Sequence, residues 1–327
     1  MALSPSTALQ MRLLQVLGAN SRAPLRSIAK KLRISPQRLH YHLRAMERGA
    51  IQNYLALIDF HRLEGRNYYV ANLKTYRLEE RAEEEVMRRL ALDPDCILLF
   101  RSEGAYNVMV GTLARDVFEA KRKLRSLLAP FAGRIEESKI VVHMGAYHGH
   151  RPQLMEGPAA GPERYRVTGG PTPTIFVSER EERLLRLIAA NARASSVELA
   201  GKLGVSPETA ARMLKRLEAR RVITGYGLLP DFGKLGLMYY RIFVRTREDQ
   251  PRRLAEVIEF LGESESVLRI IELFDGYGFL VDVTVWKENE MWDLLSSLRN
   301  RFKEYVLGYD ICRVLGVYKF SYYFASL

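Results

Sequence analysis

Apolar residues recur every three to four positions in two parts of the chain, each about fifty residues long. This spacing places apolar side chains on one face of a helix, so each part is predicted to form three short helices. In the first part the helices are predicted over residues 7–17, 24–32 and 36–48. The third helix is marked most clearly in both parts, because Ser35 and Ser206 are suitable N-caps and a proline follows each.

Runs rich in apolar residues with strand-like patterning follow each helical part. Residues 51–59 and 222–231 are candidates for a β-hairpin, in the place of a wing. Each copy then continues in the order strand, helix, two strands, helix, strand, which is typical of a ferredoxin-like sheet. We therefore predict an α+β protein, with two winged helix-turn-helix domains that are each followed by a βαββαβ domain.

The chain repeats itself at a spacing of 171 residues. Between Met11 and Glu47, 14 of 37 positions are identical to the residue 171 positions later. A stretch rich in Gly and Pro, without a sustained period, separates the two copies and is predicted to be a linker. The predicted parts are helix-turn-helix domain 1 (residues 1–66), α+β domain 1 (67–144), the linker (145–177), helix-turn-helix domain 2 (178–236) and α+β domain 2 (237–327).

Positive charge is concentrated on the helical parts of the chain. The whole chain has a formal charge of +12, and residues 1–66 and 178–236 carry +8 and +4 of it. Both α+β domains are close to neutral. A local excess of this kind is expected where a helix-turn-helix meets DNA phosphates.

The third helix of each copy presents a polar face opposite its apolar stripe. Arg and Gln can pair with base edges in the major groove, while Lys and Tyr suit phosphates. The alternative is that these faces are basic only for solubility. The residues predicted to bind DNA are Gln37, Arg38, His40, Tyr41, Arg44 and Arg48 in the first copy, and Thr209, Arg212, Lys215 and Arg216 in the second.

Several other classes of protein are disfavoured by the composition. The only cysteines, Cys96 and Cys312, exclude a disulfide scaffold and a cysteine-based zinc site. No run of 18 apolar residues is present, so we expect a soluble, cytoplasmic protein without a membrane partner. His143, His148 and His150 lie near one another but lack a nearby carboxylate or thiol, and we predict neither a metal nor a cofactor.

The run LLRLIAANARASSVELAGKLGVSPETAARMLKRLEARRVITGY resembles the winged helix-turn-helix of the Lrp/AsnC (feast/famine) regulators, and the first copy resembles a more divergent version. The βαββαβ parts resemble the family's RAM domain, which binds effectors and assembles the protein. The resemblance implies a transcription regulator that reads double-stranded DNA with its third helix and dimerises through paired RAM sheets. Because both copies lie in one chain, it implies an internal pseudo-dimer or a homo-oligomer formed through the RAM domains.

The resemblance also implies a position for an amino-acid-like effector, near a glycine-containing loop between the middle strands. The alternative is that these glycines only make a turn. The matching residues are Gly104, Tyr106 and Asn107 in the first copy and Asp275, Gly276 and Tyr277 in the second.

Siroheme decarboxylases of haem biosynthesis also resemble Lrp/AsnC proteins and work as paired, unlike subunits. A fused pair of that kind is therefore the alternative function. Such an enzyme is expected to concentrate Arg and His around its α+β cleft, to hold a tetrapyrrole that bears many carboxylates. Since the α+β domains are nearly neutral, we predict a DNA-binding regulator that is not an enzyme.

Overall fold

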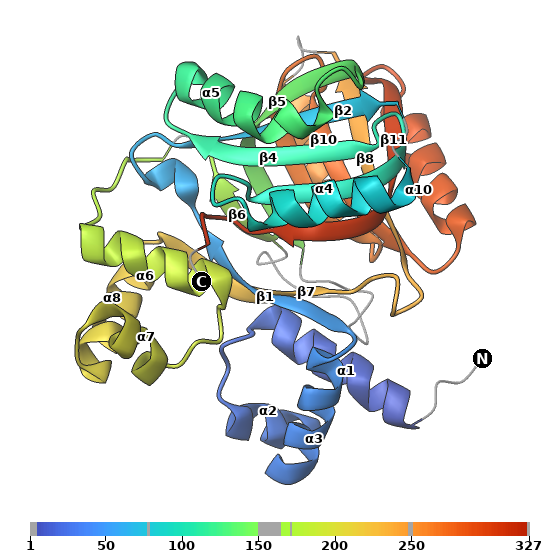
Figure 1. Cartoon of the computed structure of the whole chain (residues 1–327). Coiled ribbons are helices and arrows are strands. Elements are labelled where there is room, and N and C mark those ends of the chain that lie inside the picture. The colour runs from blue at the N-terminus through green and yellow to red at the C-terminus, as the bar shows by residue number, and fades with distance from the viewer. Residues whose placement is uncertain (1–4, 77–78, 150–164, 171, 248–250, 326–327) are drawn as a thin grey trace.

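The computed structural model describes residues 5–76, 79–149, 165–170, 172–247 and 251–325 (Figure 1). It is an α+β protein with two helix-turn-helix regions, each followed by a ferredoxin-like region, as predicted. The α-helices are α1 (Pro5–Ala19), α2 (Leu25–Leu32), α3 (Pro36–Glu47), α4 (Glu80–Leu92), α5 (Val117–Leu128), α6 (Glu179–Ala190), α7 (Ser196–Leu203), α8 (Pro207–Ala219), α9 (Pro251–Gly262) and α10 (Glu288–Arg301). The strands are β1 (Ile51–Ile58), β2 (Asn67–Thr75), β3 (Leu98–Gly104), β4 (Val108–Ala114), β5 (Ile135–Gly149), β6 (Tyr165–Gly169), β7 (Ile223–Pro230), β8 (Met238–Thr246), β9 (Val267–Phe274), β10 (Phe279–Val285) and β11 (Val306–Phe320).

The two ferredoxin-like regions join into one closed antiparallel barrel. The first copy contributes strands in the order β5-β2-β4-β3, and the second contributes them in the equivalent order β11-β8-β10-β9. The pairs β3–β11 and β5–β9 join the copies, so each of these strands has a neighbour on both sides. Closure removes the exposed edges that two separate sheets would carry.

Side chains alternate between the interior of the barrel and the layer beneath the outer helices. On β8, Ile242 and Val244 belong to a core that also contains residues of α9 and α10. Tyr239 and Phe243, which point to the other face of β8, belong to a different core that extends from the barrel interior into the helix-turn-helix regions. Figure 1 shows the barrel above the helix-turn-helix regions, with α4, α5 and α10 on its outer side. Strands β4 and β10 are buried along their whole length, which explains their nearly continuous apolar sequences.

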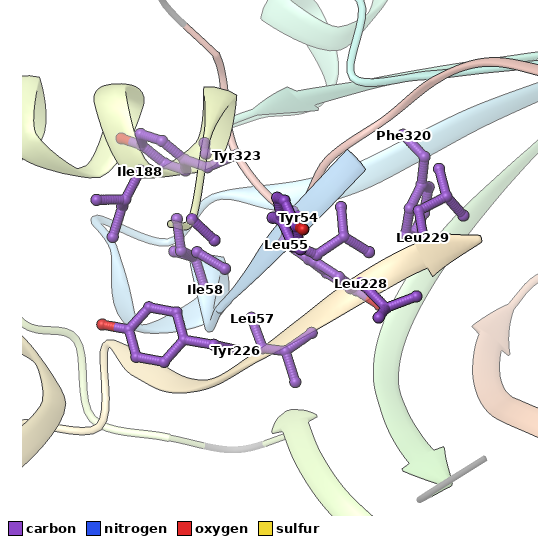
Figure 2. Close-up of a cluster of buried hydrophobic side chains, with 14 of the residues drawn as sticks. Tyr54, Leu55, Leu57, Ile58, Ile188, Tyr226, Leu228, Leu229, Phe320 and Tyr323 are labelled. Atoms are coloured by element: carbon purple, nitrogen blue, oxygen red, sulfur yellow. The ribbon is translucent and has the colours of Figure 1, made fainter. Parts of the chain in front are cut away.

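The predicted hairpins are wrong. Each segment forms a single strand, and β1 of the first copy pairs antiparallel with β7 of the second. We call this two-stranded sheet the ribbon. Leu57 and Leu228 lie among its buried side chains, and Figure 2 shows Phe320 beside Leu229 of the same ribbon. The pattern along one strand shows that a face is buried, but it does not identify the strand's partner.

Reciprocal contacts tie the helix-turn-helix of each copy to the other copy. Arg22 donates a hydrogen bond from Nη1 to the carbonyl of Ala194 (2.9 Å), and its guanidinium lies 5.3 Å from the ring centre of Tyr226. Arg193, its equivalent in the second copy, lies at the same 5.3 Å from the ring of Tyr54. The two copies are therefore packed against each other through matching surfaces.

The predicted linker, residues 145–177, is only partly irregular. Strand β5 extends through Gly145 to Gly149, and β6 pairs with this extension. The reason is that an exposed strand edge can pair with any extended segment, even one rich in Gly and Pro. Residues 150–164 lie outside the described part of the chain, and with them His150. No described helix is long and apolar enough to cross a membrane.

Candidate nucleic-acid interface and the barrel interior

The third helix of each copy is fixed by its cap and by the turn before it. The Ser35 hydroxyl accepts a hydrogen bond from the Arg38 backbone N–H (3.2 Å), which caps α3, and Ser206 caps α8 in the same way. The preceding turn is left-handed in both copies, with φ of 56° at Arg33 and 66° at Gly204. This conformation suits glycine and strains arginine, so the first copy carries backbone strain that the second avoids.

The polar faces predicted for α3 and α8 are accessible. Leu39 and Leu43 are buried beneath α3, while Tyr41 is 70% exposed on its opposite side. Thr209 is half-buried. The other predicted DNA-binding residues are exposed: Gln37, Arg38, His40, Tyr41, Arg44, Arg48, Arg212, Lys215 and Arg216. The geometry therefore leaves both faces free to meet a ligand, and their contact with DNA stays a prediction.

Two residues of the α8 face are held by neighbouring groups. Arg212 donates to the Thr209 hydroxyl (3.3 Å), and Arg216 forms an ion pair with the buried Glu181 (2.8 Å). Burial opposes ionisation of Glu181, but hydrogen bonds from Ser178 and Arg216 outweigh it and hold the pKa of the carboxyl below its usual range. Arg216 therefore also stabilises the packing of α8 on α6.

A basic groove lies between α6 and α8, and two of its arginines were not among the residues predicted to bind DNA. The groove has a volume of about 740 Å³, and Arg180 and Arg183 line it together with Arg212 and Arg216. Their spacing of three residues places Arg180 and Arg183 on one face of α6, and this was a signal that the sequence offered. The first copy differs, because Leu9 stands at the position equivalent to Arg180 and is buried.

Among the predicted effector residues, Tyr106 and Tyr277 meet at the interface between the copies. The hydroxyls of Tyr106 and Tyr277 are 2.9 Å apart, and Asn107 donates to the Thr75 carbonyl (2.8 Å). A side chain at Gly104 would meet the Ile311 carbonyl oxygen at 2.2 Å. Asp275, which directly precedes Gly276 in the loop between β9 and β10, forms an ion pair with Lys139 of β5 (3.4 Å). Effector binding at these residues stays a prediction.

The barrel interior holds a group of charged side chains that the sequence analysis did not identify. Arg241 and Asp282 are almost fully buried and form an ion pair (3.1 Å), and Arg269 donates to the other carboxylate oxygen (2.8 Å). His143 and His148 are also buried there. The net charge of the α+β domains is nearly zero because outer acidic residues balance these groups, so composition could not reveal them.

A DNA-binding domain family matches part of each copy of the repeat, and several transcriptional regulators each match the length of about one copy. The family described as "Winged helix-turn-helix DNA-binding" matches residues 6–49 and again residues 178–224. The HTH-type transcriptional regulator LrpA of Pyrococcus horikoshii is 30% identical over 124 residues, which are 37% of this chain and 85% of that protein. The chain belongs to the Lrp/AsnC family. LrpA of Pyrococcus abyssi is similar in the same way, at 31% identity over 126 residues, or 38% of this chain and 86% of the relative.

The structure of an enzyme resembles this structure over nearly the whole chain. The crystal structure of the siroheme decarboxylase NirDL matches 98% of this Lrp/AsnC protein and 94% of its own length, with a TM-score of 0.58 and 13% sequence identity. A second structure of NirDL contains an iron-uroporphyrin III analogue and matches equally well. At this identity the likeness shows a common duplicated fold. It nevertheless overturns our prediction that the protein is not an enzyme, because an enzyme shares this fold and the barrel does enclose Arg and His.

Proposed function

We propose that this Lrp/AsnC protein binds specific DNA sequences and regulates transcription in the cytoplasm. In this proposal α3 and α8 each enter a major groove and read base edges with their exposed polar faces. The observation that carries the proposal is the exposure of Arg44 and Arg212 on N-capped third helices, in the parts of the chain that hold the positive charge. Arg180 and Arg183 would contact phosphates beside α8.

We further propose that the chain acts as an internal pseudo-dimer with two unlike readers. The reciprocal contacts of Arg22 and Arg193 support this, since they hold the two copies as a dimer interface holds two subunits. The reading faces differ, because Tyr41 of α3 stands where α8 has Arg212. We therefore expect a binding site with two different half-sites rather than a palindrome.

Selection of bound duplexes from a random DNA pool at ~0.15 M salt tests the proposal, because nonspecific phosphate contacts weaken steeply with salt. Enrichment of one motif with two unlike half-sites is the expected result. The matched control is the double variant R44A/R212A, which should recover no motif. Equal recovery of all sequences by the unaltered protein would contradict sequence-specific regulation.

The alternative reading as a siroheme decarboxylase-like enzyme is tested by an independent measurement. The absorption spectrum of the protein is recorded while iron uroporphyrin III is added in the absence of DNA. A saturable shift of the porphyrin band, together with failure of the DNA selection, would replace the regulator by a tetrapyrrole-binding protein. An unchanged spectrum with an enriched motif is the outcome expected of the regulator.

A further inference from the structure

Two adjoining cavities lie at the mouth of the barrel, where the ribbon crosses it. Their volumes are about 70 Å³ and about 20 Å³. Both are lined by His148, Arg269, Phe320 and Tyr322, so they meet along a common wall. The mouth of a β-barrel is a frequent place for a small-molecule site.

The smaller cavity gathers polar atoms without hydrogen-bond partners. The Tyr68 hydroxyl, His143 Nε2, Arg241 Nη2 and His61 Nε2 are buried atoms with no partner among the described residues. Tyr68, His143 and Arg241 are each more than nine-tenths buried, and all four residues line this cavity. Buried polar atoms are nearly always paired in folded proteins, so four unpaired ones around one space favour a water or a polar ligand group there.

The charges around this cavity favour an anion. Two guanidinium groups, of Arg241 and Arg269, share the single carboxylate of Asp282, which leaves one excess positive charge in the interior. Burial holds the pKa of His143 well below its usual value, so the imidazole adds no charge. No acidic side chain lines either cavity, as far as the described residues extend. A buried charge without a counter-charge is unfavourable, and a bound carboxylate would supply one.

The larger cavity favours an apolar group. The ribbon lines it with Leu55, Leu57, Leu228 and Leu229, and the barrel contributes Phe100. Figure 2 shows the four leucines of the ribbon and Phe320 around this region. The space suits a few carbon atoms, whereas the smaller cavity has room for about one water-sized group.

We propose that these cavities bind a small organic acid with a branched apolar chain. Its carboxylate lies at the common wall, where one oxygen enters the smaller cavity and accepts hydrogen bonds from Arg241 and the Tyr68 hydroxyl. Its apolar chain lies in the larger cavity beneath the ribbon, against Leu57 and Leu228. Without a lining carboxylate, the site offers no partner for an ammonium group, so it prefers acids to the corresponding amino acids. None of the residues predicted to bind DNA lines either cavity.

Isothermal titration calorimetry of the full chain without DNA tests the proposal. The probes are 3-methylbutanoate, the uncharged 3-methylbutanamide and leucine, which share one branched chain. We expect the acid to bind at least about tenfold more tightly than the other two, since a charged hydrogen bond is worth more than a neutral one. Equal binding of acid and amide, or no binding of the acid, would overturn the proposal.

A matched pair of variants tests whether the acid binds in these cavities. Tyr68→Phe removes one hydroxyl from the cavity and is expected to weaken binding of the acid about tenfold. Tyr69→Phe removes a hydroxyl from the same strand on the outer face, where Tyr69 packs with residues of α4 and α5, and should leave binding unchanged. Equal weakening by both variants, at unchanged melting temperature, would place the acid elsewhere. The protein could instead bind iron uroporphyrin III and not the acid, with binding weakened by Tyr68→Phe. That outcome would show that the cavities belong to the site of a larger ligand, and it would overturn the proposal.

Discussion

Tyr106 and Tyr277 stand at equivalent positions of the two copies, and their hydroxyl oxygens lie 2.9 Å apart. Tyr277 also donates a hydrogen bond to Asp310, so Tyr106 is the donor to Tyr277. Contact between a residue and its own equivalent is characteristic of an interface built on twofold symmetry. The packing inside this chain therefore follows the rule of a symmetric dimer, although the two partners differ in sequence.

This pair predicts an asymmetric response to the loss of either hydroxyl. Tyr277→Phe should lower the free energy of unfolding by about 1–3 kcal/mol, because it leaves both Tyr106 and Asp310 without that partner. Tyr106→Phe should lower it by about 1 kcal/mol, because only one hydrogen bond is lost. Urea unfolding of both variants and of the double variant measures the coupling. Strictly additive effects would show that the hydroxyls do not interact.

Removal of the strain at Arg33 should stabilise the first helix-turn-helix. Arg33→Gly places a glycine in a left-handed turn, and we expect a gain of up to about 1 kcal/mol, because the relieved strain exceeds the added flexibility of the unfolded chain. Gly204→Ala is the converse control and should cost about 1 kcal/mol, because open space surrounds that position and only the backbone conformation opposes a side chain. Thermal unfolding of both variants and of the unaltered protein measures these changes in stability. Destabilisation by Arg33→Gly would contradict the left-handed turn.

Glu181 should make the stability of the second helix-turn-helix depend on pH. Its pKa is lower in the folded protein than in the unfolded chain, so its stabilising effect is complete above the unfolded pKa and disappears as the pH falls through the folded value. The free energy of unfolding should therefore decrease on acidification. Glu181→Gln should reduce this decrease, measured by urea unfolding at pH 7 and at lower pH. Glu179→Gln, at an exposed position of the same helix turn, should leave it unchanged.

Single substitutions of the reading helices should weaken specific binding. Arg44→Ala and Arg212→Ala are each expected to lose roughly 1–3 kcal/mol on the selected duplex, if the guanidinium pairs with a guanine. Fluorescence anisotropy on the selected duplex and on a scrambled one gives the measurement. Arg122→Ala changes an exposed arginine of α5, away from the reading helices, and should bind as the unaltered protein does. Unchanged affinity for the selected duplex in both reading-helix variants would show that these faces do not contact the bases.

Much of the local structure could be predicted because its causes lie within a few residues. Ser35 and Ser206 cap their helices as the sequence indicates, and the apolar stripe of Leu39 and Leu43 is buried. The exposed polar face follows from the same period. The sequence did not show that Arg216 is held by Glu181, because these residues lie 35 positions apart and meet only when α6 packs on α8.

The sequence by itself determined the duplication, the order of the elements and the family, because these follow from local pattern and from similarity. Only the tertiary structure decided that β1 pairs with β7 and that eight strands close into a barrel, since strand patterning does not identify a partner. It also decided where charge is buried. Arg241, Arg269 and Asp282 come from three strands, and a sum over the sequence counts buried and exposed charges alike. Their surroundings, rather than their number, set what they can bind.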